Sequence, residues 1–237
     1  MLLFSSLKKK GTQMSSQLYI PTLDDILQKN MFIDSAEAQE FSKKHGDFDF
    51  GIATKPLDMR DVFTIRFASY RDSGYLNPNF TFESELEFDE HDLTALLFYA
   101  RNSDTGRLHG TGRLVVDAHG RLPMDDYYPL DTFREQIGYY RGEAKLAEFS
   151  RLISHPTGQK ELNKALVRFI LEFASAHIDY IVGFGRLDIK QYYDKWGFSD
   201  IVPYEPVDVS QSNGPLRPPM KFYPHYMHVS QIQWDKI

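Results

Sequence analysis

The chain has no cysteine among its 237 residues. This absence excludes disulfide frameworks and thiolate chemistry, and it fits a reducing compartment. The sequence also has no apolar run near the ~18 residues that a membrane span requires. The first residues lack the order of a signal peptide, because Lys8, Lys9 and Lys10 follow the apolar residues instead of preceding them. We therefore expect a cytoplasmic protein without a membrane span.

An excess of basic charge is missing as well. The formal net charge is −6, which argues against a nucleic-acid-binding protein that relies on overall basicity. The histidines are scattered without the spacing of metal ligands, so we expect no metal site. What the chain does contain is ordinary for a globular protein, with 42% hydrophobic and 25% charged residues.

Residues 1–46 are predicted to form a partly helical N-terminal extension. Short helices are expected from Thr22 to Asn30 and from Ser35 to Lys44, the first with Thr22 as its N-cap and Asp25 completing a capping box. Residues 47–237 are predicted to form one domain, since no linker or internal repeat divides them.

The order of elements in this domain indicates an α+β fold. Apolar periodicity and turn residues predict a mixed central sheet flanked by helices. The expected strands are 48–53, 93–100, 108–117, 146–153, 179–184 and 221–229, and the expected helices are 58–72, 161–178 and 187–196. The strands 93–100 and 108–117 should form a hairpin, because a short turn of Asn and Gly type separates them.

The strand from Leu146 to Ile153 carries the first chemical signal. Strict alternation places Glu148 and Ser150 on one face, opposite Phe149. A carboxylate inside a buried strand is costly unless it is paired or functional. We therefore expect this strand in the middle of the sheet, with Glu148 functional. Alternation places Arg151 on the opposite face, unless a β-bulge turns it around.

Arg66 lies on the apolar face of the helix 58–72, together with Phe63 and Tyr70. Two interpretations are open. The guanidinium extends along the helix to solvent, which we favour, or it binds an anion. Aromatic side chains such as Phe98, Phe149 and Phe169 are expected mainly in the core.

Taken together, these motifs resemble a known family. The element order and the sequence from Tyr193 to Phe198, of the form Tyr-x-x-x-Gly-Phe, resemble the GNAT acyltransferase fold. The segment Glu148-Phe149-Ser150-Arg151 resembles the Glu-x-Ser-Arg element of acyl-homoserine lactone (autoinducer) synthases and long-chain N-acyl amino acid synthases. These families also have an acidic Glu-x-Asp-x-x-Asp element, an arginine with an aromatic residue one turn later on the first helix, and an arginine on the third strand. Here these are Glu87, Asp89, Asp92, Arg66, Tyr70 and Arg113.

This resemblance implies an N-acyltransferase that forms an amide bond. Glu148, Ser150 and Arg151 are its candidate catalytic residues, with Glu148 as the base that deprotonates an amine. Oxyanion donors are expected among the backbone amides near residues 152–154. The candidate substrate-binding residues are Arg66, Tyr70, Glu87, Asp89, Asp92 and Arg113.

The acyl donor is expected to be acyl-phosphopantetheine, with no tightly bound cofactor. Related enzymes that use CoA hold its diphosphate on a glycine-rich loop at a helix N-terminus. Here residues 154–160 contain only Gly158, with Lys160 after it, as candidate cofactor-binding residues. This single glycine favours acyl carrier protein over CoA. Such an acidic partner would need local positive charge, for which Arg151, Lys160, Lys164 and Arg168 are candidates.

Two alternatives stay open beside acyl transfer to an amino acid or related amine. The chain could be an acyl-homoserine lactone synthase that uses S-adenosylmethionine. It could also be a non-catalytic GNAT-like module that binds an acyl ligand. The sequence leaves the amine acceptor, the acyl length and the oligomeric state open.

Overall fold

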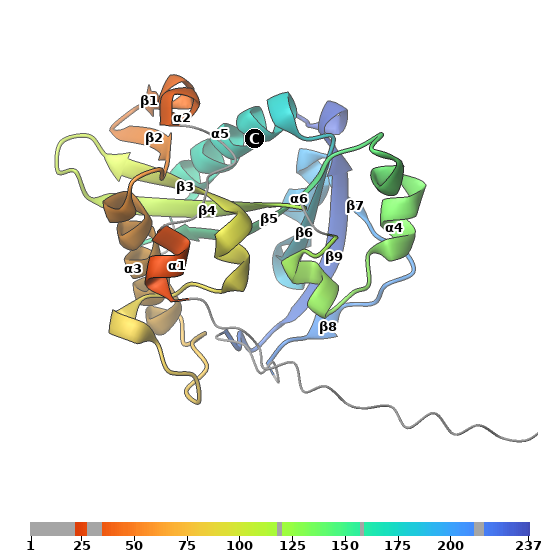
Figure 1. The fold of residues 1–237 in the computed structure, drawn as a ribbon, viewed down its shortest axis with the longest axis horizontal. Helices are drawn as coiled ribbons and strands as arrows, with labels where there is room; N and C mark the ends of the chain where they lie inside the picture. The colour runs from red at the N-terminus through yellow and green to blue at the C-terminus, as the bar shows by residue number, and fades with distance from the viewer. Residues whose placement is uncertain (1–21, 28–34, 118–119, 157–158, 211–215) are drawn as a thin grey trace, which may run out of the picture.

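A computed structural model describes residues 22–27, 35–117, 120–156, 159–210 and 216–237 (Figure 1). Within them, nine strands form one sheet in the order β1-β2-β3-β4-β5-β6-β9-β7, and β8 also pairs with β9. The strands are β1 Lys43–His45, β2 Phe48–Ile52, β3 Ala95–Asn102, β4 Leu108–Val116, β5 Leu146–Ser154, β6 Tyr180–Arg186, β7 Ser199–Asp200, β8 Val207–Asp208 and β9 Lys221–His228. The helices are α1 Leu23–Leu27, α2 Ser35–Phe41, α3 Pro56–Asp72, α4 Asp131–Gln136, α5 Lys160–His177 and α6 Lys190–Trp196.

The predicted α+β fold with a mixed sheet is confirmed. Only β5 and β6 pair in parallel, and the other ladders are antiparallel. The expected hairpin is β3 and β4, with Leu96 opposite Leu114. Strand β5 lies between β4 and β6, in the interior of the sheet. No helix among the described residues is long and apolar enough to cross a membrane.

The N-terminal elements differ in part from expectation. Thr22 and Asp25 form the expected capping box, since the Thr22 amide donates to Asp25 Oδ2 at 2.8 Å and the Asp25 amide to Thr22 Oγ1 at 3.2 Å. The end of that helix, after Leu27, lies outside the described residues. Helix α2 ends at Phe41 instead of Lys44, because Lys43 and Lys44 pair with β2 as strand β1. The division of the chain at residue 46 stays a prediction.

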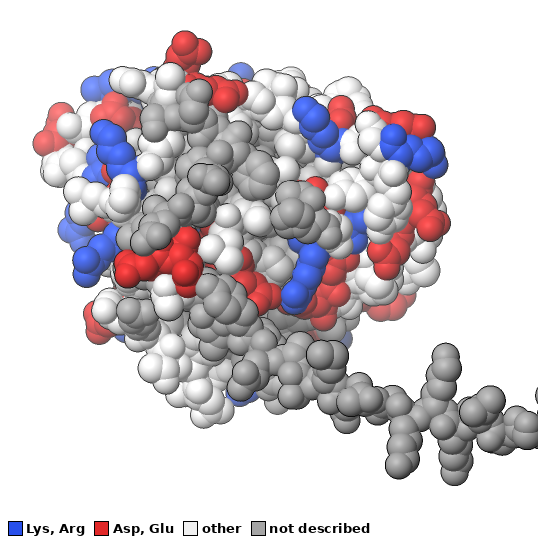
Figure 2. Space-filling view, viewed as in Figure 1, with Lys and Arg blue, Asp and Glu red and all other residues white. Residues whose placement is uncertain are grey.

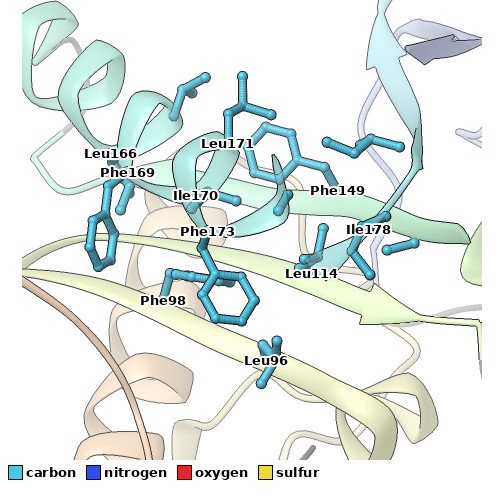
Figure 3. Packing of buried hydrophobic residues seen from close by; sticks show 14 of the residues in the cluster. Leu96, Phe98, Leu114, Phe149, Leu166, Phe169, Ile170, Leu171, Phe173 and Ile178 are labelled. Carbon is cyan, nitrogen blue, oxygen red and sulfur yellow. The ribbon is translucent and has the colours of Figure 1, made fainter. Parts of the chain in front are cut away.

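One face of the sheet is covered by α5. Phe169, Ile170 and Phe173 pack against Phe98 of β3 and Phe149 of β5 (Figure 3). A side chain at Gly112 of β4 would bring its Cβ within 2.5 Å of Ile170 Cδ1, so glycine at this position allows the helix to approach closely. The expected aromatic core is therefore the layer between α5 and the sheet.

The opposite face is covered by α3 and by the segment between β4 and β5. Met59, Val62 and Phe63 of α3 belong to a second apolar cluster, which also contains Val115 of β4 and Val182 of β6. The short helix Pro123–Asp126 adds Met124 to the same cluster. Polar residues of β5 that face this side are thus enclosed by α3 and the 120–130 segment.

Strands β5 and β6 separate part-way along their length. Their parallel pairing ends at Phe149 and Gly183. Beyond these residues β5 continues beside β4 to Ser154, and β6 continues beside β9 to Arg186. In Figure 1, β3, β4 and β5 run across the view, whereas β6 and β9 run up it. We call this separation the β5–β6 fork, and it places the residues from Ser150 onward at the edge of a divided sheet.

Candidate active site

A β-bulge in β5 turns Arg151 toward the α3 face. Ser150 lies opposite Arg113 and Ile153 lies opposite Thr111, so three steps along β5 match two steps along β4. Arg151 has a φ of 55°, in the left-handed region that only a few non-glycine residues adopt. The sequence left open whether a bulge turns Arg151 around, and the structure has one. It places Arg151 on the same side as Glu148 and Ser150.

The acidic segment before β3 supplies three carboxylates to this side. Asp89 caps the short helix Glu90–Thr94 by accepting a hydrogen bond from the His91 amide at 3.0 Å. Asp92 Oδ2 accepts in return from the Asp89 amide at 2.9 Å. This capping box fixes both aspartates, and Glu87 precedes them in the chain.

Three arginines from three elements meet these carboxylates. Arg66 of α3 lies 2.9 Å from Asp92 Oδ1. Arg113 of β4 lies 2.6 Å from Asp89 Oδ1, and Arg151 lies 2.7 Å from Asp89 Oδ2. Further contacts join Arg151 to Glu87 at 3.0 Å and Arg113 Nε to Ser150 Oγ at 3.1 Å. The charged cluster, as we call it, consists of Arg66, Arg113, Arg151, Glu87, Asp89 and Asp92.

The favoured interpretation of Arg66 is wrong. Its side chain is fully buried and does not extend to solvent. A buried guanidinium requires a counterion, which Asp92 provides, and Glu87 lies 4.0 Å away. One turn further along α3, the Tyr70 ring lies 5.9 Å from the Arg151 guanidinium carbon. The structure therefore brings both α3 residues to the charged cluster.

The cluster contains three arginines and three acidic groups. Burial raises the pKa of Glu87, against the opposing effects of Arg151 and Arg66. Although burial opposes ionisation, Arg113 and Arg151 hold the pKa of Asp89 well below its usual value. Burial likewise opposes ionisation of Asp92, and Arg66 and Arg113 lower its pKa. Burial raises the pKa of Tyr70 to about 12, so its hydroxyl stays protonated near neutral pH.

Glu148 lies beside the charged cluster, and its carboxylate forms no ion pair with the residues that the structure describes. Its side chain is buried, and Oε2 accepts a hydrogen bond from the Met124 amide at 2.7 Å. Burial raises the pKa of Glu148 to about 8, against the opposing effects of Arg113 and the Met124 amide. A carboxylate with this pKa can take a proton from an ammonium group near neutral pH, which suits a general base.

The contact between Glu148 and Met124 was missed in the sequence. Residues 121–145 are rich in Tyr, Asp and Pro, and their sequence predicted one helix near residues 130–138, where the structure has α4. Pro123 followed by Asp125 is typical of a short helical turn, because Pro suits the first position and an acidic residue the first turn. That pattern carries no information on which distant side chain the turn's amides bind.

Of the two candidate donor-binding residues, the structure places only Lys160. Gly158 is not among the described residues. Lys160 is exposed at the start of α5, on the opposite face of the sheet from Glu148. Their roles stay predictions.

A second buried polar group lies on the α5 and α6 side of the β5–β6 fork. His225 of β9 pairs with Gly183, where the β5–β6 ladder ends, and its ring lies 4.5 Å from that of Tyr193. Gly183 and Gly185 leave room for this imidazole. Burial lowers the pKa of His225 to about 3, so the ring is neutral. Sequence reasoning missed His225, because a lone histidine in a strand carries no motif.

Comparison with known families agrees with this geometry. The profile of the family described as N-acyl amino acid synthase FeeM matches residues 61–210. The chain belongs to this family. It is therefore an N-acyltransferase, as predicted. The matched residues run from α3 through the charged cluster and Glu148 to the segment after α6.

Solved structures confirm the GNAT-like fold. FeeM, an N-acyl amino acid synthase from uncultured soil microbes, is 22% identical with a TM-score of 0.56, over 79% of this chain and 92% of that chain. The acyl-homoserine lactone synthase LasI is 14% identical with a TM-score of 0.52, over 79% and 91%. A putative N-acetyltransferase from Lactobacillus plantarum is 11% identical with a TM-score of 0.50, over 78% and 99%. A comparison with curated proteins finds no match.

Proposed function

We propose that the protein transfers a fatty acyl group from a phosphopantetheine thioester to the amine of an amino acid, with Glu148 as the base. The observation that carries this proposal is a buried carboxylate with a pKa of about 8, held beside the charged cluster next to the β5–β6 fork. Membership of the N-acyl amino acid synthase family supports the acceptor class.

The reaction needs a neutral amine. Glu148 takes one proton from the acceptor's ammonium group, and the freed nitrogen attacks the thioester carbonyl carbon. The C–N bond forms as the carbonyl becomes an oxyanion, which backbone amides near residues 152–154 stabilise. Collapse of this intermediate breaks the C–S bond. The thiolate leaves with a proton from the nitrogen, and the amide remains.

The charged cluster holds the acceptor's carboxylate and ammonium groups. Arg66 is buried and the Arg151 side chain is 18% exposed. Arg66 Nε, Arg66 Nη2 and Arg151 Nε make no hydrogen bond to the described residues. These donors are available to an acceptor carboxylate, for which guanidinium geometry is well suited. Both oxygens of Glu87 lack a well-aligned hydrogen bond among the described residues, so Glu87 can accept one from the ammonium.

The donor is acyl carrier protein, which docks at the start of α5. The net charge is −6, and groups of Asp and Glu side chains lie on the face shown in Figure 2, so an acidic carrier needs a local basic site. Lys160 and Lys164 are exposed on α5. Arg168 is a weaker candidate, because its Nε already lies 3.1 Å from Glu172.

The acceptor proposal is tested by mass spectrometry of products formed from an acyl-carrier-protein thioester and a mixture of amino acids. We expect N-acyl amino acids from the wild type and almost none from Glu148→Gln. Equal product from Glu148→Gln would reject Glu148 as the base. Formation of acyl-homoserine lactone from added S-adenosylmethionine, with no N-acyl amino acid, would overturn the acceptor class.

A separate comparison tests the donor. With acyl chains of equal length, Lys164→Glu should raise KM for the acyl-carrier-protein thioester and leave KM for the acyl-CoA unchanged. Lys195→Glu on α6 is the matched control, since it makes the same charge change at another exposed lysine. A higher kcat/KM with acyl-CoA than with the carrier protein would assign the donor to CoA instead.

A further inference from the structure

A second buried network of charges lies outside the charged cluster. Arg134 of α4 is 1% exposed. Its Nε donates to Asp117 Oδ2 at 2.7 Å, and its two terminal nitrogens donate to the two oxygens of Asp125 at 2.8 and 2.6 Å. This bidentate geometry fixes the Asp125 carboxylate in both position and orientation.

Asp125 in turn fixes the turn that surrounds Met124. Its Oδ2 accepts from the Leu122 amide at 2.7 Å, and its Oδ1 accepts from the Leu130 amide at 3.1 Å. Met124 lies between these anchored amides, and its own amide donates to Glu148 Oε2. The direction of the Met124 N–H bond therefore depends on the carboxylate that Arg134 holds.

The other partner of Arg134 connects this turn to the strands that carry Glu148. Asp117 directly follows β4, and its amide donates to the Leu146 carbonyl of β5 at 2.9 Å. Arg134 thus joins the Met124 turn to the β4–β5 ladder, two residues from Glu148. No signal in the sequence links Arg134 to Glu148, and neither residue contacts the other directly.

We infer that Arg134 is a positioning residue, which holds the Met124 amide against Glu148 and thereby sets the pH at which the enzyme works. This inference rests on the proposed role of Glu148 as the base. The groups that face Glu148 are Arg113 from β4, Arg151 from β5, Asp89 from the acidic segment and the Met124 amide. The β6 residue that pairs with Glu148 is Val182, which is apolar.

The direction of the effect follows from the hydrogen bond. The Met124 amide stabilises the ionised carboxylate, so its loss favours the protonated form and raises the pKa of Glu148 further. A base is active when deprotonated, so the acid limb of kcat/KM moves to higher pH. A purely structural brace would lower the stability of the protein without moving this limb.

The experiment measures kcat/KM against pH for the wild type, Arg134→Gln and Arg134→Lys. All three are measured with the same acceptor, so that the titration of the acceptor's amine contributes equally to each profile. We expect Arg134→Gln to move the acid limb upward by about one pH unit, the order expected for one hydrogen bond to a charged group. Arg134→Lys should show a similar or smaller shift, because an ammonium group cannot bind both Asp125 oxygens as a guanidinium does.

Two controls separate positioning from stability. Arg141→Gln removes an exposed arginine from the same segment, 2.7 Å from Glu143, and should leave the limb in place. Phe133→Leu weakens the packing of α4 and should lower the melting temperature without moving the limb. If Arg134→Gln does not fold, Asp125→Asn disrupts the same contact from the other side and should give the same shift.

NMR titration of the Glu148 carboxyl carbon, assigned with Glu148→Gln, gives a readout independent of turnover. An upward shift in Arg134→Gln or Asp125→Asn supports the positioning role. If this titration shifts while the kinetic limb stays in place, Glu148 is not the base, although Arg134 still positions it. An unchanged titration in a folded variant would overturn the inference.

Discussion

Strand β5 has two faces that are built in opposite ways. On the α5 side, Ala147 and Phe149 pack against apolar side chains of the helix. On the α3 side, the bulged Arg151 belongs to the charged cluster and Glu148 adjoins it. Burial of apolar groups stabilises a fold, whereas burial of charge is costly and often neutral in net effect. The difference indicates that the α5 face serves stability and the α3 face serves chemistry.

The largest expected effect comes from removing the base on the charged face. Glu148→Gln keeps the side-chain volume and an acceptor for the Met124 amide, but it cannot take a proton. We expect kcat to fall by about 10² to 10⁴-fold. Circular dichroism should show an unchanged fold, and Glu143→Gln at an exposed position should retain full activity. Wild-type turnover in Glu148→Gln would contradict the proposal.

Breaking an ion pair on the same face tests the cost of buried charge. Arg66→Met leaves Asp92 and Glu87 buried without their closest α3 partner. We expect a loss of about 3–5 kcal/mol in the free energy of unfolding, measured with urea. The double variant Arg66→Met/Asp92→Leu should recover much of this loss, because it removes both charges. If Arg66→Met were as stable as the wild type, the buried carboxylates would not need Arg66 as a counterion.

The apolar face should respond differently. Leu166→Ala on α5 removes a fully buried side chain and should cost about 2–5 kcal/mol, depending on how far the site collapses. No charge change is involved, so the acid limb of kcat/KM should stay at the wild-type pH. A shift of that limb in Leu166→Ala would show that the two faces are coupled.

An exposed ion pair on the outer side of α5 gives the smallest effect. Arg168 lies 3.1 Å from Glu172, four residues further along the helix. Such solvent-exposed pairs contribute about 0.3–0.5 kcal/mol. Arg168→Gln should therefore change the urea midpoint only slightly. A loss as large as that of Arg66→Met would contradict the distinction between buried and exposed charge.

The sequence predicted most of what local patterns determine. Alternation in β5 placed Glu148 correctly, and the conflict over Arg151 pointed to the bulge that the structure shows. The apolar period of α5 was also clear. Helix α2 was predicted too long, because the pairing of Lys43 with Phe50 depends on a turn rather than on helix propensity.

Long-range contacts could not be predicted from the sequence. The period of α3 showed which face Arg66 occupies, but not that Asp92, 26 residues later, would neutralise it. The Met124 amide and Glu148 are 24 residues apart, and a backbone donor leaves no trace in side-chain patterns. The bidentate contact of Arg134 with Asp125 could not be predicted either, because it depends on how the 121–145 segment folds back.

The pH dependence of kcat/KM tests most directly whether Glu148 is the base. Burial raises the pKa of Glu148 to about 8, and only its deprotonated form can accept the proton. We therefore predict that kcat/KM falls about tenfold for each pH unit below this value, and that the limb assigned to Glu148 is absent from the residual activity of Glu148→Gln. A wild-type profile without an acid limb near pH 8, or the same limb in Glu148→Gln, would contradict the assignment.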